Sequence, residues 1–193
     1  MSSPTKSPPE YKFTYHKSLE PFNKTMRQWL VDNNKHWDGL ATGALVFNPQ
    51  NKILLVQRAA TDSMPNKWEI PGGAADEEDP SLLHACAREL WEEAGLVATR
   101  FKHTVKENPS GGDTQGVFTN RTGTRFFCRF SFEVEVEDWN CVKLDPEEHQ
   151  DFLWVTEAEA MAGRVGHKDI VITFRQMRDL ILEGFRLRRE NEP

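Results

Sequence analysis

Apolar positions along the chain change their spacing from block to block, the pattern of alternating strands and helices. Runs of β-branched and aliphatic residues predict four strands, at 43–47, 53–56, 125–136 and 151–155. Apolar positions three and four residues apart predict two substantial helices, at 80–94 and 169–187. Because the strands are interleaved with helices, we expect an α/β layered domain.

The helix over 80–94 carries signals at both ends. Asp79 is a good N-cap, Pro80 suits the first helical position, and Gly95 suits the C-terminal stop. Its apolar side chains fall on a single stripe, which is expected to face the core.

The first 38 residues are predicted to be an N-terminal extension to a domain at 39–193. Residues 1–10 are rich in Ser, Pro and Lys and are expected to be disordered. A short helix is predicted near 24–31. Trp29 and Trp37 could cover the chain's own core or a second subunit, so a homodimer is a possible assembly.

Composition and charge exclude some classes of function. The chain has 193 residues with 24 Lys and Arg against 30 Asp and Glu, a net charge of −6, which argues against a duplex nucleic-acid partner. Small phosphorylated ligands stay compatible, because a bound metal can reverse a local field. Three widely spaced cysteines, the lack of a secretory signal and the lack of a long apolar run predict a cytoplasmic protein with no membrane partner.

Three carboxylates gather on the helix over 80–94. Glu89, Glu92 and Glu93 share one arc within a turn, where like charges repel, and the C-terminal end of a helix disfavours acidic groups further. A solvated acidic face is one interpretation, and a site for hard divalent cations is the other. The neighbouring Arg88 and the flexible pair Gly72-Gly73 favour the metal site.

The segment Arg88-Glu89-Leu90-Trp91-Glu92-Glu93-Ala94-Gly95-Leu96, preceded by Pro71-Gly72-Gly73, resembles the Nudix box, Gly-x5-Glu-x7-Arg-Glu-U-x-Glu-Glu-x-Gly-U with U aliphatic. The second half matches at every fixed position. The first half departs, because the stretch from Gly73 to Arg88 is one residue longer than the family pattern and Pro80 stands where the family has Glu. An insertion before Pro80 would let Glu78 or Asp79 take that place.

The resemblance extends over about residues 40–155 and also takes in Gln57-Arg58 and the run from Asn66 to Gly73, which are similar to antimutator nucleoside-triphosphate pyrophosphohydrolases. It implies a Nudix-type α/β/α sandwich with a mixed sheet, and hydrolysis of a nucleoside diphosphate linked to another moiety, such as a nucleoside triphosphate or ADP-ribose.

The same resemblance implies residue roles and a cofactor. Mg²⁺ or Mn²⁺ would be held by the Gly73 carbonyl together with the helix carboxylates Glu89, Glu92 and Glu93. Arg88 would orient Glu89, and Arg58 would contact phosphate. The general base is either a glutamate of the box or one from a later loop, where Glu147 and Glu148 are the candidates and an acidic solvated turn is the alternative.

Substrate contacts are less defined. Trp68 or Phe118 could stack on a base, with a core position as the alternative for each. Arg125 belongs to a basic stretch around the glycine-rich loop at 110–116, which could contact a polyphosphate or be a solvated strand face.

Other function classes remain open. The strand after Arg125 is faintly similar to diphosphoinositol polyphosphate phosphohydrolases. A non-catalytic nucleotide-binding module on the same fold is a second alternative, although such a module does not need three mutually repelling carboxylates. Isomerisation of an isoprenoid diphosphate is a more distant third.

Overall fold

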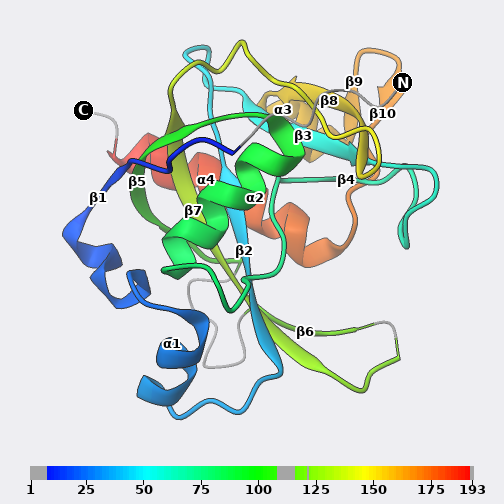
Figure 1. Ribbon diagram of the computed structural model, residues 1–193. Coiled ribbons are helices and arrows are strands. Elements are labelled where there is room, and N and C mark those ends of the chain that lie inside the picture. Colours follow the sequence, from blue (N-terminus) through cyan, green and yellow to red (C-terminus); the bar gives the residue numbers. More distant parts are fainter. Residues whose placement is uncertain (1–7, 108–115, 121, 192–193) are drawn as a thin grey trace, which may run out of the picture.

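The computed structural model describes residues 8–107, 116–120 and 122–191 (Figure 1). The N-terminal part forms β1 (Thr14–Tyr15), the 3-10 helix η1 (Lys17–Phe22) and α1 (Met26–Asp32). The remaining helices are α2 (Leu82–Ala94), α3 (Glu157–Ala162) and α4 (Arg175–Asn191). The remaining strands are β2 (Gly39–Leu45), β3 (Ile53–Arg58), β4 (Trp68–Glu69), β5 (Ala98–Val105), β6 (Val117–Thr119), β7 (Phe126–Val136), β8 (His149–Val155), β9 (Arg164–Val165) and β10 (Lys168–Asp169).

The larger sheet is mixed, in the order β1-β5-β7-β2, with β6 also pairing with β7. β1 with β5 and β7 with β2 are parallel, whereas β5 and β7 are antiparallel. A second, antiparallel sheet has the order β4-β3-β8. In Figure 1, α2 lies in front of β2 and β7, and α4 lies behind them.

Successive residues at the end of β2 pack alternately into two hydrophobic cores. Ala44 and Val46 belong to a cluster with the apolar stripe of α2, whereas Leu45 belongs to a cluster with Met177 and Ile181 of α4. This alternation follows from the period of two along a strand. The predicted α/β/α sandwich with a mixed sheet is confirmed.

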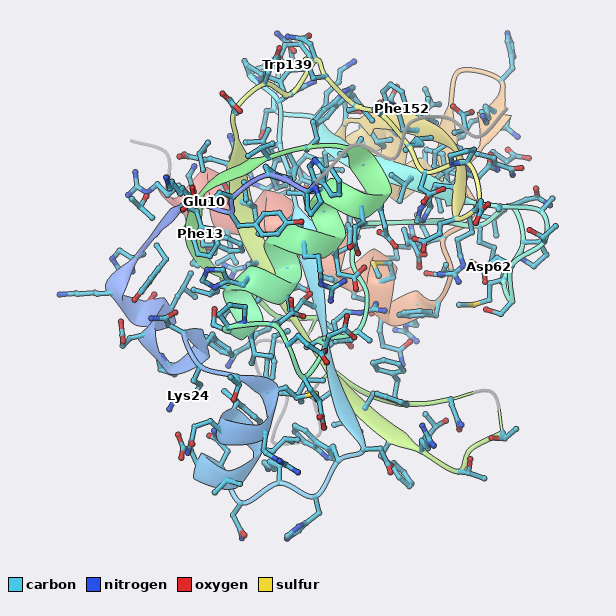
Figure 2. The ribbon with its side chains drawn as sticks, viewed as in Figure 1. Glu10, Phe13, Lys24, Asp62, Trp139 and Phe152 are labelled. Atoms are coloured by element: carbon cyan, nitrogen blue, oxygen red, sulfur yellow. The ribbon has the colours of Figure 1, made fainter. Side chains whose placement is uncertain are left out.

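The N-terminal segment packs on the same body. Leu19 is buried in the α2 cluster, and Trp29 is buried beside Leu40 in a third cluster. Phe13, labelled in Figure 2, contacts Phe101 of β5 edge to face at 4.8 Å. Residues 1–7 of the stretch expected to be disordered lie outside the described residues, and the division at residue 38 stays a prediction. Among the described residues, no helix combines the length and apolar character needed to cross a bilayer.

Several predicted boundaries shift. The N-cap of α2 is Ser81, whose hydroxyl accepts the His84 N–H, so Asp79 as N-cap is wrong; its carboxylate is engaged elsewhere. Gly95 is the C-cap, in the left-handed conformation, as predicted. The last helix starts at Arg175 instead of 169, because residues 164–169 form the β9-β10 hairpin and Ile172 bridges to Trp68.

Candidate active site

The loop before α2 runs along the free edge of β2. The Ala44 N–H donates to the Pro71 carbonyl at 2.9 Å, and the Thr42 N–H donates to the Gly73 carbonyl at 2.8 Å. Gly72 has φ +151°, and a Cβ there would lie 2.2 Å from the Thr42 oxygen, so only glycine fits this close approach. The sheet edge therefore fixes the Gly-Gly loop in place.

Two carboxylates of α2 reach this loop. Glu93 accepts the Gly72 N–H at 2.6 Å, and Gly73 approaches Glu89 so closely that a Cβ would lie 2.5 Å from Glu89 Oε2. Burial raises the pKa of Glu93 well above its usual range. Burial also raises the pKa of Glu89 to about 7, although Arg88 opposes the shift. Glu89 and Glu93 therefore lie where burial makes their charged forms costly.

Arg88 ties the helix to the loop. Its Nη1 donates to Glu89 Oε1 at 2.9 Å and to Glu92 Oε2 at 2.8 Å. On the other side, Nε and Nη2 donate to the two Asp79 oxygens at 3.1 and 2.9 Å, and Nη2 also reaches the Ala74 carbonyl at 2.9 Å. Glu78 and Asp79 were the two candidates for the place of the first glutamate of the motif, and Asp79 is the one that contacts Arg88. The contact between Arg88 and Glu89 is present as predicted.

The loop before β8 and the first residue of β8 bring two more side chains to Glu93. Ligand atoms of Glu93, Glu148 and His149 all lie within 4.8 Å of one another. A register shift at Gln57/Arg58, where β3 pairs with β8, places His149 opposite Arg58. Glu148 lies at the surface. Partial desolvation of its carboxyl group, and then the nearby Asp145 carboxylate, raise its pKa. Residues 55 positions apart in sequence thus converge on one cluster.

This donor set fits a hard divalent cation. Arg88 pairs with Glu89 and Glu92, but within the described part of the chain no ion pair reaches Glu93 or Glu148. Carboxylate and carbonyl oxygens are the ligands that Mg²⁺ prefers, and two neighbouring carboxylates without a cation are unfavourable.

The residues predicted to contact the substrate differ in their burial and in their surroundings. Arg58 lies beside the cluster, where it pairs with buried Glu69 and donates to Asp62 at 2.6 Å. Trp68 is fully buried against residues of α4 and cannot stack on a base, so this interpretation is wrong. Phe118 is 37% exposed and stacks on Phe127 in the β6-β7 hairpin.

Arg125 lies in the turn between β6 and β7, where its backbone N–H and carbonyl both bond to Asn120. Among the described contacts, none joins its side chain to the α2 carboxylates. Most of the glycine-rich loop at 110–116 lies outside the described residues.

Sequence reasoning missed an aromatic cavity of about 380 Å³. Trp29 and Trp37 stack at 6.0 Å between ring centroids, and Phe130 completes this wall. The lining also includes Arg129, which is close enough to Glu93 and Glu69 for their charges to act on its pKa. The two tryptophans in the extension were the available signal, but the sequence does not reveal that they face a cavity.

Tyr11 is a second residue that sequence reasoning missed. Its buried hydroxyl has no hydrogen-bond partner among the described residues. Burial, then the Glu92 carboxylate, raises its pKa, so the N-terminal segment borders the Arg88 cluster.

Comparisons with known proteins agree with this geometry. A family model described as NUDIX domain matches residues 37–174. CTP pyrophosphohydrolase of Escherichia coli K12 is 28% identical over 127 residues, which cover 66% of this chain and 83% of that protein. Phosphatase NudJ of the same strain is 32% identical over 96 residues, covering 50% of this chain and 54% of NudJ, so the chain matches only about half of that relative.

The fold also matches a solved structure. The MutT protein of Methanosarcina mazei Go1 is 23% identical, with a TM-score of 0.54 over 80% of this chain and 96% of that one. At this identity the likeness concerns the fold alone.

Proposed function

This chain belongs to the NUDIX family of hydrolases, and from that premise we propose that it is a metal-dependent pyrophosphohydrolase acting on a nucleoside triphosphate. One observation carries the proposal: Glu89 and Glu93 are fixed against the Gly72-Gly73 loop, where Glu148 joins them. A solvated acidic face would leave these carboxylates exposed, whereas Glu93 is 7% exposed.

The proposed metal ligands are the Gly73 carbonyl, Glu89, Glu92 and Glu93, with Glu148 beside them, and the proposed ion is Mg²⁺ or Mn²⁺. When bound, the ion neutralises diphosphate charge and lowers the pKa of an attacking water. The chain's own task is to hold the carboxylates in position: Gly72 N–H fixes Glu93, and Arg88 fixes Glu89 and Glu92. Arg58, at the edge of the cluster, is the proposed phosphate contact.

Glu148 is the proposed general base. Its side chain accepts no hydrogen bond among the described residues, whereas Glu89 and Glu93 each already accept one. Its raised pKa brings the carboxyl closer to the range in which a base works at neutral pH. A base must also reach the attacking water, and the exposed position of Glu148 allows this.

The nucleoside class rests on the aromatic cavity and on the CTP pyrophosphohydrolase relative. The half-buried Trp37 indole, packed on Trp29, offers an aromatic surface to a base, and Arg129 lines the same cavity, close enough to Glu93 for their charges to interact. A panel of nucleoside triphosphates, ADP-ribose and a diphosphoinositol with Mg²⁺ tests this class. Tight nucleotide binding with no turnover on the panel would favour the non-catalytic module instead.

The central test is Glu93→Gln with CTP as substrate and pyrophosphate release as the readout. The amide oxygen can still accept the Gly72 N–H, so the loop should keep its place. Loss of the charge should lower kcat by about 100-fold or more. Glu78→Gln, an exposed acid on the preceding loop, is the matched control and should turn over normally. Unchanged turnover of Glu93→Gln, with an unchanged circular dichroism spectrum, would overturn the proposal.

A further inference from the structure

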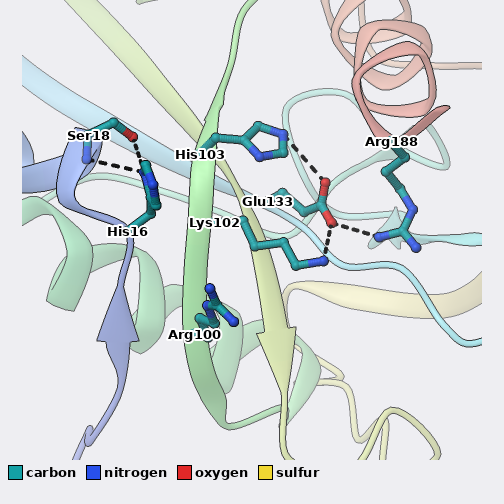
Figure 3. Close-up of a pocket in the computed structure, with 7 residues that line it drawn as sticks. All are labelled: His16, Ser18, Arg100, Lys102, His103, Glu133 and Arg188. Carbon is teal, nitrogen blue, oxygen red and sulfur yellow. Dashed lines mark hydrogen bonds and ion pairs between the residues drawn. The ribbon is translucent and has the colours of Figure 1, made fainter. Parts of the chain in front are cut away.

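A second, polar cavity of about 380 Å³ lies beside β5, and none of the α2 carboxylates lines it. Its lining comes from four parts of the chain: the start of η1, β5, β7 and α4 (Figure 3). The lining residues are His16, Ser18, Arg100, Lys102, His103, Glu133 and Arg188.

The cavity is rich in cations although the whole chain carries −6. Three basic side chains, Arg100, Lys102 and Arg188, line it together with two imidazoles. The facing carboxylates are Glu133 and, just outside the lining, Glu135, which pairs with Lys102 at 3.1 Å. Positive charge therefore exceeds negative charge at this position.

The buried Glu133 organises the cations. Its Oε1 accepts Arg188 Nη1 at 2.7 Å and Lys102 Nζ at 3.2 Å (Figure 3). Arg188 Nε also donates to Asn51 Oδ1 at 2.8 Å, so this guanidinium is held at two points. Cations anchored in this way lose little entropy when an anion arrives.

Three side chains around the cavity, Arg100, His103 and His16, have hydrogen-bonding capacity that the described part of the chain does not use. Among the described contacts, the Arg100 side chain forms no ion pair or hydrogen bond, and His103 Nε2 lies 3.5 Å from Glu133 Oε2 without making a hydrogen bond (Figure 3). His16 Nδ1 accepts the Ser18 N–H at 3.3 Å, which leaves the ring proton on Nε2 of the neutral imidazole. Glu133 Oε2 is buried beside the His103 ring and accepts no hydrogen bond among the described residues, so it can accept one from a ligand hydroxyl.

The cavity is separate from the proposed catalytic site. In the larger sheet, β7 lies between β5 and β2, and the Gly72-Gly73 loop follows the far edge of β2. Two strand spacings, about 10 Å, therefore separate β5 from β2 within the sheet. Burial lowers the pKa of His103, and the charged groups that also act on this pKa are Glu133, Lys102, Arg188 and His16, with none of the α2 carboxylates among them.

We propose that this cavity binds a small phosphate-bearing anion, either inorganic phosphate or a phosphate monoester. Arg100 contacts the phosphate as a fork of two N–H donors, and His16 supplies a further donor from the N-terminal segment. Glu133 Oε2 accepts the proton of a hydrogen phosphate or of a ligand hydroxyl. The binding joins the N-terminal segment to β5, independently of diphosphate cleavage.

The test is a titration of the full metal-free chain with inorganic phosphate, followed by ¹⁵N NMR of the arginine and histidine side chains. Phosphate should shift the Arg100 and His103 signals, and Arg100→Gln should weaken binding by about tenfold or more. Arg175→Gln removes an arginine whose side chain is 91% exposed, outside the cavity, and should bind phosphate normally.

Glycerol 3-phosphate separates the two possible ligands. Tighter binding of glycerol 3-phosphate than of phosphate would assign a monoester, and the reverse order would assign inorganic phosphate. Equal phosphate affinity of Arg100→Gln and the unmutated chain would overturn the proposal, as would shifts confined to α2. Because no turnover is measured, failure of the proposed hydrolysis leaves this test intact.

Discussion

Two aspartates contact the same guanidinium of Arg88 but differ in burial, which allows a paired prediction. Asp79 is 9% exposed at its side chain and accepts both Nε and Nη2, whereas Asp76 is 61% exposed and lies 3.4 Å from Nη2. Asp79 Oδ2 also accepts the Asp76 N–H at 2.8 Å. Substituting each by Ala compares a buried acid with an exposed one on a single arginine.

Asp79→Ala removes three hydrogen bonds and leaves Arg88 partly buried. Breaking a buried ion pair costs about 3–5 kcal/mol, and we expect the low end, about 3 kcal/mol, because Glu89, Glu92 and the Ala74 carbonyl still contact Arg88. For a chain of this size that corresponds to a Tm lower by about 6–12 °C. Asp76→Ala should cost about 0.5 kcal/mol or less, because solvent screens the exposed pair and the backbone N–H remains.

Thermal unfolding followed by circular dichroism, with both variants in the same buffer, measures the difference. Equal losses of Tm in the two variants would refute the argument that burial decides the strength of these pairs. Asp79→Ala should also lower kcat, because Arg88 positions Glu89, while Asp76→Ala should not.

Two further predictions concern Glu89 and the tryptophans. Between pH 4.5 and about 7 the folded metal-free chain keeps a proton on Glu89 that the unfolded chain has lost, so this group's contribution to stability falls as the pH rises through that window. In EDTA, the fall of Tm from about pH 5 to about pH 7.5 should be smaller in Glu89→Gln than in the unmutated chain, and equal falls would contradict the assignment. Trp68→Ala should lower the free energy of unfolding by about 3–5 kcal/mol and leave KM for CTP unchanged in the folded fraction. Trp37→Ala should raise KM for CTP. A raised KM for Trp68→Ala, with an unchanged KM for Trp37→Ala, would contradict both assignments.

Local features of the site could be predicted from the sequence. Glu89, Glu92 and Glu93 share a helix face because of the helical period, and Gly95 ends the helix because only glycine readily adopts the left-handed conformation found there. The alternation of strands and helices also determined the layered fold, since each apolar face must be buried against another element.

Long-range features depended on the tertiary structure. Glu148 meets Glu93 through the register of β8 on β3, and Trp29 faces a cavity through the packing of α1 on β7. Asp79 rather than Glu78 pairs with Arg88 because the loop path, which hydrogen bonds to β2 determine, brings Asp79 to the guanidinium. Trp68 is core rather than binding site because α4 covers it. Periodicity reports which side of an element is apolar, but only the assembled chain decides which element covers that side and which polar groups from distant segments meet.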